Sequence, residues 1–80
     1  MSTEQDHLNE LLDHLLALDS RAGMESALRA LLTPGEFTEI IKRLQILRML
    51  EAGVPQRKIA EQLGVGIATV TRGSRVLQGN

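Results

Sequence analysis

The apolar residues of the first half of the chain recur three and four positions apart, which is the period of an amphipathic α-helix. Leucines between positions 8 and 16 mark one such stretch, and the apolar residues from Met24 to Leu32 mark a second. Small and turn-forming side chains at residues 18–23 interrupt the period between them. The pattern predicts two helices, each with one apolar face.

A third helix is predicted from its starting residues. Thr33 suits the N-terminal cap, Pro34 suits the first helical turn, and Glu36 can bond back to the cap amide. The apolar residues that follow cover more than one side of the helix: Phe37, Ile40, Ile41, Leu44, Ile46, Leu47, Met49 and Leu50. We therefore expect this helix to pack on two sides and to lie at the centre of the core.

Two glycines and a proline divide the rest of the chain. Gly53 is predicted to end the third helix in the left-handed conformation, and Pro55 to open the next helix. Gly64 then lies where two short helices would meet at a tight turn, which also requires a left-handed residue. Residues 56–77 therefore have the organisation of a helix-turn-helix.

The side chains of this segment fit the same interpretation. Its inner face is expected to consist of Ile59, Ala60, Leu63, Val65, Val70 and Leu77. The outer face of the second helix keeps short or basic side chains, which can approach base edges and phosphates: Ala68, Thr69, Thr71, Arg72 and Arg75. We interpret the segment as a DNA-binding helix-turn-helix. A pair of ordinary core helices is the structural alternative.

Charge is divided unevenly, although the net charge is −1. Residues 1–40 contain eight acidic and two basic side chains, whereas residues 41–80 contain seven basic and two acidic ones. The second half can therefore attract phosphate and the first half would repel it. This asymmetry agrees with the position of the helix-turn-helix.

Composition limits the possible classes of function. The 80 residues include no Cys, which excludes disulfides, thiolate zinc sites and a cysteine nucleophile. His7 and His14 have no third fixed ligand, so no metal site is expected, and no Ser, His and carboxylate constellation indicates an enzyme. No apolar run approaches the ~20 residues of a membrane span, and the acidic start is unlike a secretory signal, so a cytoplasmic protein is expected.

No segment has the alternation of a strand, so the expected fold is all-α, a small helical domain with a C-terminal helix-turn-helix. Domains near this size bury only about 60% of their unfolded surface, so association between chains is the expected source of further stability. We predict one compact domain in which residues 1–54 form a dimerisation and ligand-pocket region. Residues 55–80 would form the DNA-binding head.

Residues 31–77 resemble the tryptophan repressor family of dimeric bacterial transcription regulators, itself a standard example of helix-turn-helix docking. The resemblance rests on LLTP at residues 31–34, on Arg43, and on QRKIAEQLGVGIATVTRGS at residues 56–74. Residues 1–30 are similar only in helical pattern. The family implies an intertwined homodimer and a repressor that binds a two-fold symmetric DNA operator when L-tryptophan is bound.

The resemblance also implies a ligand site. The indole ring would lie between Arg43 and Arg72, and the carboxylate would meet Arg72 and the Thr33 hydroxyl. Backbone carbonyls near Leu32 would accept from the ammonium group, and Gly73 would line the pocket. Val76 stands where the family usually has a serine near that ammonium group. A valine side chain has no acceptor, so this position weakens the expected affinity for L-tryptophan.

The family's DNA-contacting positions correspond here to Gln56, Arg57, Ile67, Ala68, Thr69, Thr71 and Arg72. A lysine common on the family's first motif helix is Ala60 here, so Lys58 and Arg75 are expected to supply charge instead. The linker at residues 53–55 is one residue shorter than in the family, and the chain ends at Asn80, so dimerisation is expected to rest on the first three helices.

Two other functions stay open at this point. One is a helix-turn-helix protein with a different effector or none, which Val76 and the short linker favour. The other is a helical interaction module without DNA binding, which the near-zero net charge and the acidic first half favour.

Overall fold

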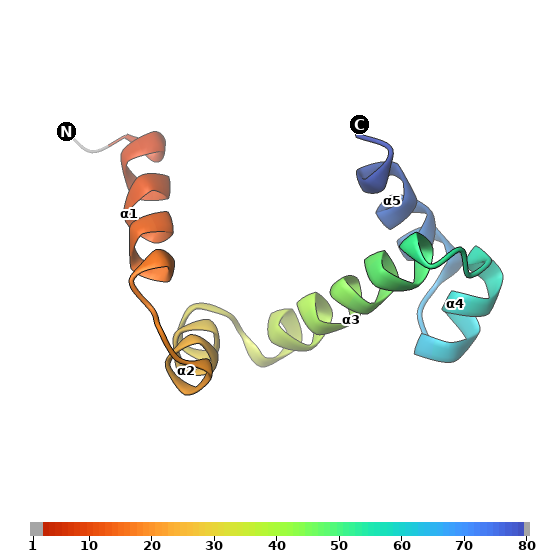
Figure 1. The fold of residues 1–80 in the computed structure, drawn as a ribbon, viewed down its shortest axis with the longest axis horizontal. Coiled ribbons are helices and arrows are strands. Elements are labelled where there is room, and N and C mark those ends of the chain that lie inside the picture. The colour runs from red at the N-terminus through yellow and green to blue at the C-terminus, as the bar shows by residue number, and fades with distance from the viewer. Residues whose placement is uncertain (1–2, 80) are drawn as a thin grey trace. The chain divides into compact units, whose positions relative to one another are not determined.

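The computed structural model describes residues 3–79, and within that range the chain consists of five α-helices joined by short turns, without any strand (Figure 1). The helices are α1 (Glu4–Leu16), α2 (Arg21–Leu31), α3 (Pro34–Glu51), α4 (Gln56–Leu63) and α5 (Ile67–Leu77). The predicted all-α fold is confirmed. The chain divides into two units, one ending at Phe37 and the other beginning at Thr38, which are described separately below.

Side-chain caps start the first two helices. The Thr3 hydroxyl accepts a hydrogen bond from the Asp6 N–H at 3.1 Å, and the Asp6 carboxylate accepts from the Thr3 N–H at 3.1 Å. The Ser20 hydroxyl accepts from the Gly23 N–H at 3.0 Å and caps α2. Both helices therefore begin before the apolar period that marks them, because polar first turns contribute nothing to that period.

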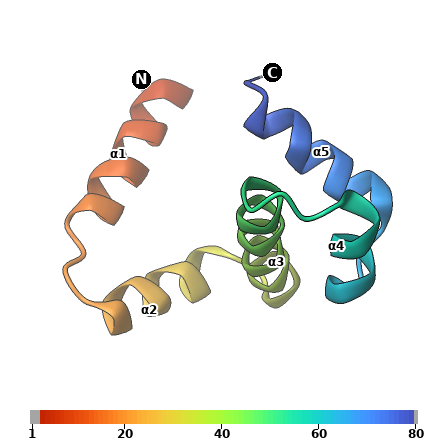
Figure 2. The same cartoon turned by 45° about the vertical axis from the view of Figure 1, so that its right-hand side comes forward.

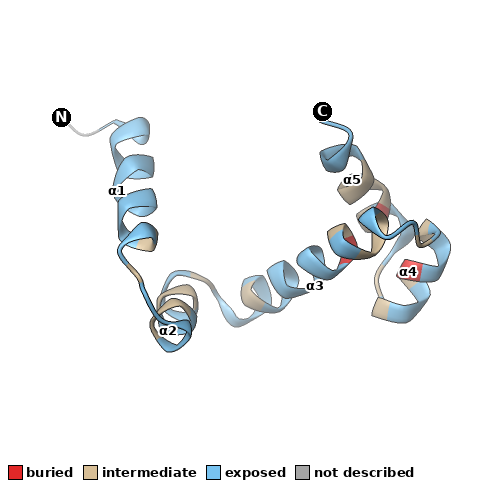
Figure 3. Ribbon diagram, viewed as in Figure 1, coloured by how far each residue is buried: buried red, intermediate tan, exposed pale blue. Residues whose placement is uncertain are grey.

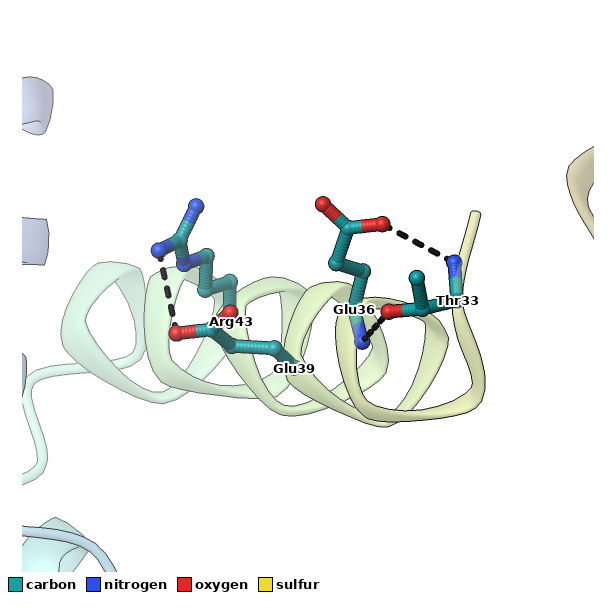
Figure 4. A network of polar contacts seen from close by, with 4 residues as sticks. All are labelled: Thr33, Glu36, Glu39 and Arg43. Atoms are coloured by element: carbon teal, nitrogen blue, oxygen red, sulfur yellow. Dashed lines mark hydrogen bonds and ion pairs between the residues drawn. The ribbon is translucent and has the colours of Figure 1, made fainter. Parts of the chain in front are cut away.

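The start of α3 has the predicted chemistry. The Thr33 hydroxyl accepts from the Glu36 N–H at 3.1 Å, and the Glu36 carboxylate accepts from the Thr33 N–H at 2.9 Å (Figure 4). Nearby, the Arg29 guanidinium lies over the Phe37 ring, 4.5 Å from its centroid. Arg29 also donates to the Glu25 carboxylate at 2.8 Å. The junction between α2 and α3 is thus fixed by one capping box and one cation–π contact.

The capping box at Glu36 predicts a pH dependence of stability. The pKa of Glu36 lies below its ordinary value of 4.5, because the backbone N–H and then the side chain of Thr33 hydrogen-bond to the charged carboxylate. This stabilisation is present above the unfolded-state pKa and is lost as the pH falls through the lowered folded-state pKa. We expect Glu36→Gln to lower the unfolding temperature at pH 7 and to have a smaller effect at pH 3.

Circular dichroism melts at the two pH values would measure this difference. Glu10→Gln is the matched control, because it removes an exposed carboxylate of α1 that caps no helix. An equal loss of stability at pH 7 and pH 3 for Glu36→Gln would contradict the assignment of the charged carboxylate to the cap.

The second unit has a small core to which three helices contribute. Ile46 of α3, Ile59 of α4 and Val70 of α5 are its fully buried side chains (Figure 3). Six partly buried residues pack against them: Met49, Leu50, Val54, Ala60, Leu63 and Val65. The predicted inner-face positions of Ile59, Ala60 and Leu63 in α4 and of Val70 in α5 are therefore confirmed.

The turns of this unit are also as predicted. Gly53 has φ 85° after the end of α3, and Gly64 has φ 65° between α4 and α5. The N–H of Gly64 and the N–H of Val65 both donate to the Ala60 carbonyl, which closes the end of α4. The adjacent helices α4 and α5 pack on each other (Figure 2), and the helix-turn-helix is confirmed.

Two packing predictions are wrong for the single chain. Leu77 was expected on the inner face of the helix-turn-helix but is 42% exposed. The predicted two-sided packing of α3 is also wrong, because Ile46 is its one buried residue and Ile41 and Leu44 are about half exposed. The spacing of apolar residues shows which faces of a helix are apolar. It does not show whether the same chain or another chain buries those faces.

Candidate functional site

A cavity of about 250 Å³ lies between α3 and α5 in the second unit. Arg43, Ile46 and Leu47 of α3 line one side, and Thr69, Arg72, Gly73 and Val76 of α5 line the other. Pockets for drug-sized ligands have volumes of roughly 300–1,000 Å³, so this cavity suits a smaller molecule. One of its walls is the second helix of the helix-turn-helix.

The cavity combines positive charge with apolar walls. No acidic side chain lines it, and the two guanidinium groups are its charged members. Arg43 donates to the Glu39 carboxylate at 3.2 Å (Figure 4), but both side chains are more than half exposed, so this pair is weak. Arg72 forms no ion pair with any of the residues 3–79. The site therefore favours a ligand with a flat apolar body and an anionic group, since guanidinium planes stack on aromatic rings.

Gly73 allows α5 to approach α3 closely beside this cavity. A Cβ atom at this position would lie 2.9 Å from Cγ2 of Ile46 and 3.5 Å from Cδ1 of Leu50. Ile46 is buried and cannot move away without disturbing the core. Glycine is therefore required here for helix packing as well as for open space in the cavity.

Four of the six residues proposed to bind a ligand line this cavity: Arg43, Arg72, Gly73 and Val76. The other two belong to the first unit, where Leu32 is the C-cap of α2 and the Thr33 hydroxyl caps α3. Ile46, Leu47 and Thr69 also line the cavity, although sequence reasoning did not assign them to the ligand. Ile46 and Leu47 follow Arg43 by three and four residues, and Thr69 precedes Arg72 by three. This spacing places each of them on the same helix face as its arginine, and it could have predicted that they line the site.

The residues proposed to contact DNA lie at the start of α4 and along α5. Arg57 and Lys58 are exposed on α4, and Ala68, Arg72 and Arg75 are exposed on α5. Ile67, the first residue of α5, is 51% exposed although it is apolar. An exposed apolar side chain at the start of a helix that enters the major groove can contact a thymine methyl group.

Gln56, Thr69 and Thr71 are half-buried. The Thr71 hydroxyl lies 2.8 Å from Oε1 of Gln56 and 3.0 Å from the carbonyl oxygen of Ile67. The first of these contacts joins α5 to the start of α4 across 15 positions of sequence. Sequence reasoning placed both residues at the DNA surface and did not predict a bond between them.

Among the described residues, no helix is long and apolar enough to cross a membrane. The same residues contain no group of three or more His, Asp or Glu side chains placed to hold a metal ion.

Known proteins that are similar to this chain belong to one family of repressors. The family described as "Trp repressor protein" matches residues 6–80. A "Trp operon repressor homolog" of Actinobacillus succinogenes is 37% identical over 79 residues, covering 98% of this chain and 78% of that protein. The homologue of Photobacterium profundum is 52% identical over 52 residues, covering 64% of this chain and 50% of that protein. No solved structure matches the chain.

Proposed function

The chain belongs to the Trp repressor family, and we propose from this premise that it is a homodimeric repressor whose affinity for a two-fold symmetric operator is raised by bound L-tryptophan. Membership of this family makes it a DNA-binding transcriptional repressor and not an enzyme. The ligand, its site and the dimer are our inference. We place the protein in the cytoplasm, where a bacterial repressor meets its operator.

One observation carries the proposal. α5 forms a wall of the cavity through Thr69, Arg72, Gly73 and Val76, and it also carries most of the residues that we propose to contact DNA. A molecule that fills the cavity therefore acts on the orientation of the reading helix. If only one orientation matches successive major grooves, a ligand that binds that orientation more tightly raises DNA affinity.

The chemistry of the cavity supports an aromatic amino acid as the ligand. Arg43 and Arg72 on opposite walls can hold an indole ring between their guanidinium planes, and Arg72 can pair with the carboxylate. The hydroxyl of Thr33 and the carbonyl of Leu32 are the further groups that the family resemblance assigns to the ligand.

Exposed apolar surface supports the homodimer. The helices α1 and α2 have no buried residue in the single chain. Their exposed leucines, together with apolar residues of α3, are available for a second copy: Leu8, Leu11, Leu12, Leu16, Leu31, Ile40, Ile41 and Leu44. A stable monomer rarely exposes this much large apolar surface.

A second candidate function follows from Val76. This side chain lines the cavity but offers no acceptor for the ammonium group of an amino acid. The alternative is therefore a repressor with a different effector, or with none, that uses the same DNA-reading face.

Fluorescence anisotropy separates the two candidates, because the chain has no Trp or Tyr and free L-tryptophan can be excited alone. Titrating the protein into dilute L-tryptophan should give a saturable rise. Val76→Ser should tighten binding by about tenfold, because a hydroxyl can accept a hydrogen bond from the charged ammonium group. In the same samples, L-tryptophan should strengthen binding of a labelled operator duplex by roughly 5–150-fold.

The operator duplex for this experiment is obtained by selection from a random pool with the parent chain. A flat anisotropy signal up to millimolar protein for both parent and Val76→Ser would contradict L-tryptophan as the effector. Duplex affinity that persists in that case would establish the second candidate function.

A further inference from the structure

The hydrogen bond between Thr71 and Gln56 is the one bond between side chains of different helices within residues 3–79. It joins the middle of α5 to the first residue of α4, and the bond is partly buried. The two helices that it joins are the two helices of the DNA-binding motif. The bond is therefore well placed to affect how that motif meets DNA.

The donor in this bond is Thr71. A threonine hydroxyl has one proton, and both oxygens near it, Oε1 of Gln56 and the carbonyl oxygen of Ile67, are acceptors. The proton is therefore directed toward the protein. While this arrangement holds, Thr71 cannot donate a hydrogen bond to a base.

Gln56 accepts this bond through its side-chain oxygen, which leaves the side-chain amide nitrogen free to donate to another group. The Oε1 atom of Gln56 is occupied by Thr71, and the amide nitrogen forms no hydrogen bond within the described residues. The preceding residue, Pro55, supplies no side-chain cap, so no protein side chain bonds to the first amides of α4. Glutamine side-chain amides and backbone amides at the start of a helix both commonly donate to DNA phosphates.

We propose that Thr71 is a positioning residue, which holds the Gln56 amide so that its nitrogen donates to the DNA backbone. This rests on the proposed function as a DNA-binding repressor. A free glutamine side chain loses rotational entropy when it binds, and the bond to Thr71 orients it before DNA arrives. Thr71 thus contributes to affinity and to the docking of α4, without reading a base.

The proposal predicts how Thr71→Val binds two duplexes, the selected operator and a scrambled duplex of the same length. Valine keeps the shape of threonine but has no hydroxyl. We expect affinity to fall roughly three- to tenfold for both duplexes, because a phosphate contact carries no sequence information. The dependence of affinity on salt should not change, because a neutral amide releases no counterion.

A double-mutant cycle tests whether Thr71 acts through Gln56. Gln56→Ala removes the phosphate contact itself and should weaken binding at least as much as Thr71→Val, and adding Thr71→Val to it should have no further effect. Thr71→Ser keeps the hydroxyl and should restore most of the affinity. Circular dichroism melts of all variants verify that the fold is kept.

Four outcomes would overturn the proposal. A loss confined to the selected duplex would show that Thr71 reads a base directly. Independent effects of Thr71→Val and Gln56→Ala would show that the two side chains do not act together, and an unchanged affinity for Thr71→Val would show that the bond has no role. A parent chain that bound neither duplex would overturn the proposed function, and this assignment with it.

Discussion

Replacing Arg72 with alanine is expected to abolish measurable L-tryptophan binding at micromolar protein and to weaken operator binding as well. Arg72 lines the cavity, is exposed on α5 and has no ion-pair partner among the described residues. A hydrogen bond to a charged group contributes about 1.5–3 kcal/mol and a cation–π contact about 0.5–2 kcal/mol. Together these predict a loss of L-tryptophan affinity of roughly thirtyfold to several thousandfold.

Arg75→Ala is the matched control for this prediction. Arg75 lies on the same helix and is exposed, but it does not line the cavity. We expect Arg75→Ala to weaken duplex binding and to reduce its salt slope by about one unit, while L-tryptophan binding stays near the parent value. Equal losses of L-tryptophan affinity in the two variants would mean that Arg72 acts through the net charge of α5 and not through contact with the ligand.

Gly73→Ala is expected to destabilise the protein, although alanine is the better helix former. The added Cβ atom would lie 2.9 Å from Cγ2 of Ile46, a buried residue that also lines the cavity. Overpacking of this kind costs about 1–3 kcal/mol, and moving α5 away from α3 would change the cavity. We therefore expect a lower free energy of unfolding together with weaker L-tryptophan binding.

Gly35→Ala provides the comparison, because Gly35 also lies in a helix and a Cβ atom there would meet nothing within 4 Å. Gly35 lies in the first turn of α3 and Gly73 lies within α5, so both variants gain helix propensity, but only Gly73→Ala adds a steric contact. Urea unfolding should show Gly73→Ala about 1–3 kcal/mol less stable than Gly35→Ala. Equal stabilities would mean that α5 and α3 can separate at this point without cost.

Local chemistry explains why the boundaries of the last three helices were predictable. The cap at Thr33 and the left-handed conformations of Gly53 and Gly64 depend on residues within a few positions of one another. Their sequence neighbours therefore determine them. The same holds for the periodic burial that placed Ile59 and Val70 in the core.

The candidate ligand site was predictable in part. Arg43 and Arg72 were assigned to it through resemblance to a family, because no local pattern relates two arginines 29 positions apart. Ile46, Leu47 and Thr69 were missed, since their contribution depends on which face of α3 meets α5. That meeting requires a glycine at position 73, whose steric role becomes visible only with the Ile46 side chain beside it.

Local hydrogen bonding, periodicity and composition were enough to predict the five helices of residues 3–79, the turns between the last three and the basic charge of residues 41–80. Three features became visible only in the folded chain: the cavity between α3 and α5, the exposure of Leu77 and the bond from Thr71 to Gln56. These three features depend on the distance and the crossing angle between packed helices. Packing of side chains distant in sequence sets both quantities, and no short segment encodes them.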